Sequence, residues 1–432
     1  MKGADAAGGA GDTKPAGHSA SSARAAVRPD GGPGEPGRPG LPGYLRSVGD
    51  RLRSGRLGVL PVVVSLLVTW IVFQSLNHNF LSPRNLSDIC VDIVGPGLIA
   101  VGIVFVLLLG EVDLSVGSVS GLTAAIFAVM YVNHGVPEWL AIVSALLAGA
   151  AIGTLQGLLF ARVGVPAFVV TLAGLLAWNG LMLYVLGASG TIDVGDRGLV
   201  ADLSDRYFHS AVLAYGLAAL STGTFFVMAY RDNRARRSAG MSVLPMWEIV
   251  ERTAGVAVPS FGAAWILEDF RGVPLALLVF LVFVVGLDFV LRRTTYGRGI
   301  FAIGGDVEAA RRSGINVVWT RVSAFAMSGT LAAVGGLFLT SRVASVGQTS
   351  GSTTLLINAI AAAVIGGVSL FGGHGTTWSA LLGILVIQSI ASGMVLIGVQ
   401  TAVQYMVTGG VLLGAVILDS LSRRSQQIHG RA

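Results

Sequence analysis

The chain has 432 residues, of which 53% are hydrophobic and only 12% are charged, with a formal net charge of +6. Because soluble globular domains carry roughly 25% charged residues, this composition excludes a soluble globular protein and indicates a membrane protein. The net charge reflects arginines between apolar runs, so it predicts no nucleic-acid partner. Lys2 and Lys14 are the only lysines. The chain therefore lacks the lysine of a GxxxxGK[ST] phosphate loop and cannot be its own P-loop ATPase.

The N-terminal segment has the composition of a disordered tail. Residues 1–43 consist mainly of Gly, Ala, Pro and Ser with scattered charges, and they cannot bury enough apolar surface to fold. We expect a disordered cytoplasmic tail over residues 1–56. No apolar segment precedes Leu57, so the first span is expected to act as an uncleaved insertion signal.

Long apolar runs recur from Leu57 onward, and about 20 such residues span roughly 30 Å of hydrocarbon. They predict an all-α integral membrane protein, a polytopic bundle of about 10–12 transmembrane helices. The weakest run begins with Glu248, Glu251 and Arg252, which are costly at the bilayer centre. That helix is expected to start shallow or to pack inside the bundle. The runs lie near residues 57–76, 86–109, 114–132, 139–161, 165–187, 211–230, 246–268, 273–291, 320–340, 354–372, 377–398 and 402–421.

Arginine clusters indicate which loops are cytoplasmic. With an even number of spans, all the clusters fall on one side, and the positive-inside rule makes that side the cytoplasm. The opposite loops hold mostly single arginines. We therefore expect both termini inside, a transmembrane domain over 57–421 and a cytoplasmic C-terminal tail over 422–432. The clusters lie within residues 46–56, 231–237, 292–312 and 423–424.

Two segments share one pattern and predict internal repeats. Residues 93–121 and 357–383 both run from small apolar residues through a glycine-rich break into a new helix. Paired interruptions of this kind occur in transporter repeats and often mark the translocation pathway. Chance similarity between glycine- and alanine-rich helices is the alternative.

The first break, residues 110–117, reads GEVDLSVG and places two carboxylates between two spans. Carboxylates at or near membrane depth need partners or water. Asp113, followed by Leu and Ser, suits a helix N-cap. The segment could line the path, transmit the movement of a motor subunit, or simply cap the third helix, and these roles are compatible. We call it the signature turn, with residues Gly110, Glu111, Asp113, Leu114, Ser115 and Gly117.

A polar loop at residues 304–316, GGDVEAARRSGIN, lies between two membrane-length apolar runs. It carries the EAA-x3-G pattern of the loop by which an ABC-transporter permease engages its ATPase. The stretch EAARR favours a helix, and Gly314 suits a left-handed residue at its end. The alternative is an ordinary solvated loop with two arginines as topology anchors. The expected ATPase-coupling loop spans about 292–319, and its candidate residues are Gly305, Glu308, Ala309, Ala310, Arg311, Arg312 and Gly314.

Four motifs together resemble the permease subunits of bacterial monosaccharide ABC importers, the family that handles ribose, galactose, arabinose and xylose. The resemblance covers roughly residues 57–425, and the extra basic loop and weak span at 231–268 are most similar to the xylose-type permeases. The motifs are GEVDLSVGS at 110–118, VPAFVVTLAG at 165–174, YGRGIFAIGGDVEAARRSGI at 296–315 and AAAVIGGVSLFGGHGT at 361–376.

The resemblance implies a permease homodimer in the bacterial cytoplasmic membrane, joined to cytoplasmic ATPase subunits and an extracytoplasmic sugar-binding protein. ATP and Mg would then belong to the ATPase, and this chain would be a transport subunit without a cofactor or metal, not an enzyme. No Leu-Pro follows the hydrophobic residue after Gly314, which departs from the broader EAA pattern and leaves the contacts of the loop open.

Two other functions stay open at this point. One is an ABC permease for another small polar solute, such as a branched-chain amino acid or a signalling sugar. The other is an ion-coupled secondary transporter, which is expected to hold an isolated ionisable residue deep in a span. Asp288 is the nearest case, but it lies within about a turn of Arg292 and can reach the interface.

The sugar route should offer hydrogen-bonding side chains, and an aromatic ring could stack on a pyranose face. Most intramembrane polar residues instead join helices to each other, which is the alternative. The candidates are Thr171, Trp178, Asn179, Asn358 and Gln388. Loop 188–210, expected outside, is a candidate docking surface for the binding protein, or else ordinary solvated charge. His374, in GGHGT, is interpreted as a turn residue and Cys90 as a packing residue.

Overall fold

Helices make up nearly all the regular structure of residues 60–241 and 243–428, the part of the chain that the computed structural model describes. The expected disordered tail at residues 1–56 lies outside the described residues. Each apolar run coincides with a helix or a helix pair, so the all-α polytopic fold is confirmed. The helices at these runs are α2 (Leu60–Leu76), α3 (Pro83–Asp92) with α4 (Val94–Leu108), α5 (Val116–Ala128) with η1 (Val129–Asn133), α6 (Glu138–Leu158) with η2 (Leu159–Val163), α7 (Ala167–Leu186), α9 (Ala211–Ser238), α10 (Met246–Phe270), α11 (Leu275–Arg293), α14 (Val317–Val343), α15 (Thr353–Ile365), α16 (Thr377–Leu396) and α17 (Thr401–Ile428).

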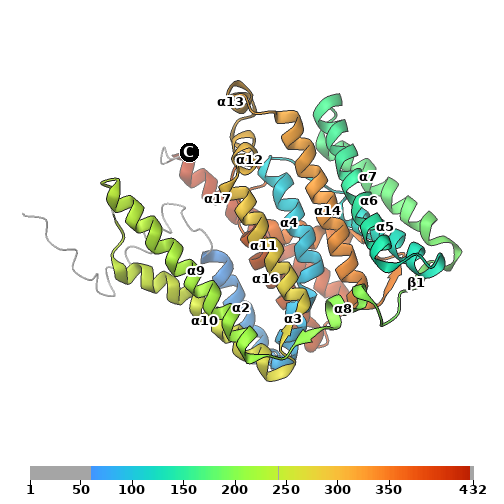
Figure 1. Ribbon diagram of the computed structural model, residues 1–432, viewed down its shortest axis with the longest axis horizontal. Coiled ribbons are helices and arrows are strands. Elements are labelled where there is room, and N and C mark those ends of the chain that lie inside the picture. Colours follow the sequence, from blue (N-terminus) through green and yellow to red (C-terminus); the bar gives the residue numbers. More distant parts are fainter. Residues whose placement is uncertain (1–59, 242, 429–432) are drawn as a thin grey trace, which may run out of the picture. The chain divides into compact units, whose positions relative to one another are not determined.

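Short elements join these helices at the two ends of the bundle. At one end lie α12 (Thr295–Gly305) and α13 (Val307–Arg312). The opposite end carries α8 and two small antiparallel pairs of strands, as Figure 1 shows for α8 and β1. The remaining elements are η3 (Gly187–Ser189), β1 (Thr191–Asp193) paired with β4 (Ser345–Gly347), α8 (Leu199–Asp205), and β2 (Tyr207–Phe208) paired with β3 (Val273–Pro274).

Among the described residues, seven helices are long and apolar enough to cross a membrane, or eight if α3 and α4, bent by 42°, form one span. This number is smaller than the predicted 10–12. The main reason is length, because α2 has 17 residues and α15 only 13. The glycine-rich sequence after Ile365 ends α15 well before the expected boundary at residue 372.

Helix α4 forms the centre of the bundle. Every residue of α4 except Pro96 is buried, and its apolar surface faces α14, α15, α16 and α11. A helix that is hydrophobic on all sides is expected to be surrounded by other helices. The signature turn, which follows α4 directly, is partly buried: Asp113 and Ser115 are buried, whereas Gly110 is exposed.

Helices α6 and α14 approach each other closely through small residues. Gly149, Gly153 and Gly157 recur at every fourth position of α6, so they lie on one face of that helix. A methyl group at Gly153 would collide with the backbone carbonyl of Phe325, and one at Gly149 would collide with the backbone of Gly329. Contacts between small residues allow membrane helices to pack at short distance without a hydrophobic driving force.

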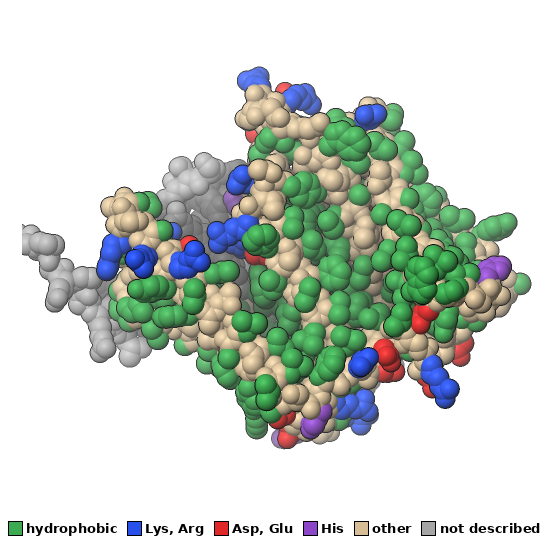
Figure 2. Space-filling view, viewed as in Figure 1, with side chains coloured by type: hydrophobic (Ala, Val, Ile, Leu, Met, Phe, Trp, Pro, Cys, Tyr) green, Lys and Arg blue, Asp and Glu red, His purple; other side chains and the backbone are tan. Residues whose placement is uncertain are grey.

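Apolar side chains cover the outer faces of several helices. Figure 2 shows a broad hydrophobic belt, with the charged side chains gathered towards the ends of the bundle. Leu147 on α6 and Leu176 on α7 are among the exposed apolar residues of this belt. Such a surface is stable against lipid and unstable in water.

Helix α10, the weakest predicted span, lies at the outside of the bundle and packs against α9 and α3. The alternative that it packs inside the bundle is therefore wrong, since Val258 and Trp265 are exposed. Two of its charges pair within the helix, because the Arg252 guanidinium donates to Glu248 one helical turn earlier at 2.6 Å.

Candidate functional site

The predicted ATPase-coupling loop forms a short capped helix, α13, which protrudes at one end of the bundle (Figure 1). Asp306 caps it, because its Oδ1 accepts hydrogen bonds from the backbone N–H groups of Glu308 (2.9 Å) and Ala309 (3.0 Å). Gly314 has φ 81°, so it adopts the left-handed conformation that the sequence predicted for the end of this helix. Both ends of α13 are therefore held in place by local interactions.

Helix α13 presents charge outward and one small residue inward. The side chains of Glu308 and Arg311 are 63% and 61% exposed and form an ion pair at 3.0 Å. Ala310 is buried against the bundle, whereas Ala309 is exposed. An exposed, rigid helix of this kind is suited to docking in a groove of another protein.

Three distant segments meet at the base of this element. The backbone N–H of Gly373 donates to the carbonyl of Leu108 at 3.0 Å, which joins the break after α15 to the end of α4. Gly304, at the end of α12, lies so close that a methyl group there would collide with the same Leu108 carbonyl. A methyl group at Gly110 would lie 3.2 Å from the carbonyl oxygen of Phe371. The segment α12–α13, which we call the coupling element, thus touches the backbone at the end of α4 and in the break after α15.

The signature turn is organised around a buried carboxylate. Asp113 is 2% exposed, and its Oδ1 accepts hydrogen bonds from the backbone N–H (2.9 Å) and the hydroxyl (2.7 Å) of Ser115. Its Oδ2 accepts a hydrogen bond from Ser328 of α14 at 3.2 Å. Because a buried charge is costly unless it is paired or hydrogen-bonded, these donors are what allow Asp113 to lie here.

The prediction that Asp113 is the N-cap of the third helix is wrong in position. The N-cap residue of α5 is Ser115, whose own side chain makes no capping bond. Asp113 lies two residues earlier and accepts from Ser115, the local bond of an Asx turn. The carboxylate therefore closes the turn and attaches it to α14.

Gln156 of α6 extends this buried network and was not predicted. Its Nε2 donates to Ser115 Oγ at 3.0 Å, and the residue is 2% exposed. Thr171 of α7 donates to the carbonyl of Val112 at 3.3 Å, and to Ala167 in its own helix at 3.0 Å. Thr171 therefore joins α7 to the signature turn. This contact supports the alternative stated above, in which an intramembrane polar residue connects parts of the bundle.

The other candidate path residues do not gather in one place. Trp178 lies near Gln156, since a methyl group at Gly174 would meet both Gln156 Nε2 and Trp178 Nε1. The Trp178 Nε1 group is buried and has no hydrogen-bond partner in the described part of the chain. Asn179 is half-buried on the same helix.

Asn358 and Gln388 belong to α15 and α16. Asn358 Oδ1 is buried and lacks a partner among the described residues. Gln388 lies close enough to Asp92 of α3 for the two side chains to interact. Arg342 Nε donates to Asp92 at 2.7 Å, and Arg342 lies in the last turn of α14, at the side opposite to α13.

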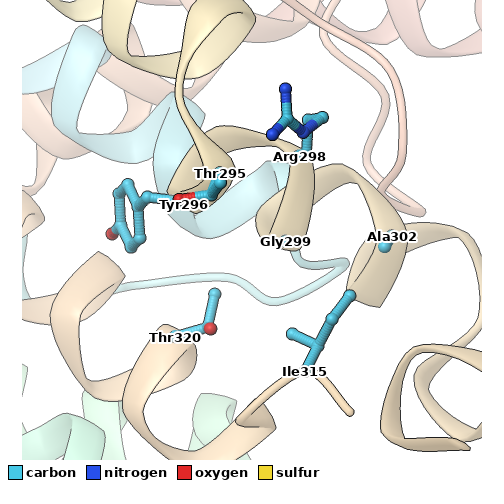
Figure 3. A pocket seen from close by; sticks show the side chains of 7 residues that line it. All are labelled: Thr295, Tyr296, Arg298, Gly299, Ala302, Ile315 and Thr320. Carbon is cyan, nitrogen blue, oxygen red and sulfur yellow. The ribbon is translucent and has the colours of Figure 1, made fainter. Parts of the chain in front are cut away.

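A cavity of about 510 Å³ opens beside the coupling element, between α12 and the start of α14 (Figure 3). In Figure 3, Arg298 and Thr320 lie on opposite sides of this opening, and the Arg298 side chain points away from Thr320. Ser323 Oγ donates to the Tyr296 hydroxyl at 3.1 Å, and burial raises the pKa of the Tyr296 phenol. The lining residues are Thr295, Tyr296, Arg298, Gly299, Ala302, Ile315 and Thr320.

Loop 188–210, at the opposite end, is held in a defined conformation. Glu138 of α6 accepts hydrogen bonds from the backbone N–H groups of Leu199 and Val200, both at 2.7 Å, which caps α8. The charged residues of loop 188–210 that face solvent are Asp193, Asp196, Arg197, Asp202, Asp205 and Arg206.

His374 lies at the other end of the bundle. Its backbone carbonyl accepts a hydrogen bond from the backbone N–H of Ser369, in keeping with its predicted turn role.

Arg321, on α14, is an interior charged residue that the sequence analysis did not single out. It forms an ion pair with Glu111 of the signature turn, with 3.8 Å between Nη2 and Oε1. The available signal was an arginine at the start of the predicted run 320–340, which resembles an ordinary cytoplasmic anchor. By contrast, Asp288 pairs with Arg292 in its own helix at 3.0 Å, so it is not an isolated carboxylate.

The chain as a whole is similar in sequence to permease components of transport systems. A profile of the family described as branched-chain amino acid transport system / permease component matches residues 85–416. The chain is 36% identical over 374 residues to the xylose transport system permease protein XylH of Escherichia coli K12, covering 86% of this chain and 94% of that protein. It is 35% identical over 381 residues to XylH of Haemophilus influenzae, covering 87% and 99%. It is 32% identical over 366 residues to the ribose import permease protein RbsC of Bacillus subtilis, covering 85% and 94%. No solved structure matches the chain significantly.

Proposed function

The chain belongs to this family of transport-system permease components, and we propose that it is the membrane-spanning subunit of an ATP-driven importer for a monosaccharide. The resemblance that the four sequence motifs indicated is thereby confirmed. The protein is a multi-pass membrane transport subunit and not an enzyme. The similarity to xylose permeases supports a pentose such as xylose as the substrate.

The observation that carries the coupling mechanism is the position of α13. This helix is exposed and capped at both ends, and the segment before it touches the backbone at Leu108 and Gly373. A subunit that closes on ATP and pushes α13 would therefore move the signature turn and the break after α15 through backbone contacts. Because glycines occupy these contacts, backbone meets backbone directly, and no flexible side chain lies between them to absorb the movement.

The charge distribution supports the partners and the orientation. Five arginines, at 292, 293, 298, 311 and 312, lie at the end that carries α13, which favours a cytoplasmic position for this end. A cytoplasmic ATPase would dock there and hold ATP and Mg, and both termini of the chain would lie on the same side. Loop 188–210 would then face outward and receive a sugar-binding protein. We further propose that two copies of the permease assemble as a homodimer surrounded by lipid.

The substrate route is proposed to pass the buried groups that lack partners. Trp178 Nε1 and Asn358 Oδ1 are such groups, and unpaired polar atoms in an apolar interior are costly unless a ligand or water meets them. Sugar hydroxyls supply both donors and acceptors. Two amide side chains would offer the sugar further hydrogen bonds. They are Gln156, beside Ser115 of the signature turn, and Gln388, beside Asp92.

The test is transport by the chain in its own host. A strain that lacks the gene, with and without a plasmid copy, is assayed for uptake of radiolabelled xylose, arabinose, ribose and leucine. We expect pentose uptake to depend on the gene and to stop when ATP is depleted at constant membrane potential. Gene-dependent uptake of leucine alone would support the amino-acid permease that the family description names. Uptake that follows only an ion gradient would make the chain a secondary transporter.

A further inference from the structure

The signature turn carries a second attachment to α14, separate from the bond between Asp113 and Ser328. Arg321 and Glu111 face each other with 3.8 Å between Nη2 and Oε1, and their side chains are only 19% and 24% exposed. The pair between Glu308 and Arg311 on α13 is more than 60% exposed on both sides. Water and salt therefore screen the interior pair much less than the surface pair.

Arg321 also rests on an aromatic ring. Its Cζ lies 4.6 Å from the centroid of Phe160, near the end of α6, and Phe160 in turn packs against Phe325. A guanidinium at this distance from an aromatic face is attracted to it. The Arg321 Nε group is buried and has no hydrogen-bond partner in the part of the chain that the structure describes. The guanidinium is thus held in place while one of its donors is unused.

The two attachments lie on one face of α14. Arg321 and Ser328 are seven residues apart, and about seven residues make two helical turns. Their partners, Glu111 and Asp113, both belong to the signature turn. A shift or rotation of α14 therefore acts on this turn at two points.

Helix α14 follows the coupling element directly, with only Ser313–Asn316 between α13 and Val317. The distance of 3.8 Å between Arg321 Nη2 and Glu111 Oε1 is longer than that of a charge-assisted hydrogen bond, which is about 2.8 Å. In a bidentate contact, the Nε group of Arg321, which has no partner among the described residues, would also donate to the Glu111 carboxylate. The geometry leaves room for a tighter contact after a small displacement.

We infer that Arg321 and Glu111 are positioning residues that transmit movement of α13 to the signature turn and tighten their contact in one state of the transport cycle. This inference rests on the proposed function, because it concerns the coupling of ATP hydrolysis to sugar movement. Removing either charge leaves the ATPase docked and active and breaks the connection to the translocation path.

The experiment uses the full chain purified with its ATPase and reconstituted with the binding protein. The variants are Arg321→Gln, Glu111→Gln and the double variant, and the control is Glu248→Gln with Arg252→Gln, an ion pair within α10 at the outside of the bundle. ATP hydrolysis and xylose uptake are measured on the same preparations. Each single variant is expected to lower uptake about tenfold at an unchanged hydrolysis rate, and the double variant is expected to be no worse, because neighbouring residues in one interaction are not additive. The control is expected to match the wild type.

Other outcomes overturn the inference. These are unchanged uptake in Arg321→Gln, losses that multiply to about a hundredfold in the double variant, or a parallel fall of hydrolysis and uptake. If Arg321→Gln fails to reach the membrane, Arg321→Lys is used, which retains the charge without the fork and is expected to retain partial uptake. A wild-type chain that neither binds an ATPase nor transports sugar would refute the proposed function itself, and the inference with it.

Discussion

The two ends of α14 are both attached to the segment formed by α3, α4 and the signature turn, but the attachments differ in strength. At the C-terminal end, Arg342 donates to Asp92 at 2.7 Å and to Asp88 at 3.4 Å. At the N-terminal end, Arg321 faces Glu111 alone at 3.8 Å. The C-terminal end is thus paired with two carboxylates, and the end beside the coupling element with one carboxylate at a longer distance.

We call the C-terminal end of α14, which pairs with two carboxylates, the fixed end, and the N-terminal end, which pairs with one, the movable end. The movable end is the one that follows α13, where a push from a motor subunit would arrive. The fixed end lies near loop 188–210, where Ser341 Oγ accepts from the backbone N–H of Ser204 at 3.0 Å.

The largest expected effect is at Gly304, where the movable end meets the turn. Gly304→Ala should reduce xylose uptake by more than about a hundredfold, because the new methyl group collides with the Leu108 carbonyl. Gly286→Ala on α11 is the control, since a methyl group there meets nothing within 4 Å. Equal uptake in the two variants would show that the close contact does not matter.

Gly314 comes next, because its constraint is conformational. Gly314→Val should lower uptake roughly tenfold while the chain still reaches the membrane, since holding a β-branched residue at φ 81° costs on the order of 1–3 kcal/mol. Gly314→Asn should retain most of the uptake, because Asn tolerates the left-handed region. The space around Gly314 is open, so a loss in both variants would point to a direct contact with the ATPase instead.

The fixed end should matter for stability more than for coupling. Arg342→Gln leaves two carboxylates without their cation and should lower the melting temperature of the detergent-solubilised chain by roughly 2–4 °C. The three side chains are 28–39% exposed, which keeps the effect modest. Thermal unfolding of Arg321→Gln serves as the comparison, and a larger shift there would reverse the assignment of fixed and movable ends.

The smallest effect is expected from Ser328→Ala, which removes one of the hydrogen bonds to Asp113. The loss of such a bond costs about 1 kcal/mol, so uptake should fall by roughly fivefold or less. Asp113→Asn in the same assay should be more severe, because it also changes the acceptor for Ser115. A null effect of both substitutions would leave Arg321 as the sole link between α14 and the turn.

Local features were predictable because they depend on short stretches of chain. The helix over EAARR and the left-handed Gly314 follow from residue propensities, and both are present. The positions of the apolar helices follow from the length that a bilayer requires. The glycine-rich break after α15 was also predicted, but the helix ends at Ile365, earlier than the expected boundary at residue 372.

The candidate site was predictable only in part. The sequence pointed to Asp113 and Glu111 as carboxylates in need of partners, but it could not name Ser328 or Arg321, which are more than 200 residues away along the chain. Gln156 and Arg321 were missed, because an amide or an arginine in an apolar run is compatible with many neighbours. The path candidates were chosen by residue type, and their dispersal over α7, α15 and α16 depends on how those helices pack.

By itself, the sequence determined that this is an all-α membrane protein with a capped charged helix between two spans, because hydrophobic length, glycine conformation and helix capping are local properties. Only the tertiary structure decided that Gly304, Leu108 and Gly373 meet at one point and that the two ends of α14 are held unequally. Those facts depend on which helices lie side by side. Apolar helices present similar surfaces to one another, so their neighbours are selected by small residues and a few buried polar groups whose partners lie far away in the chain.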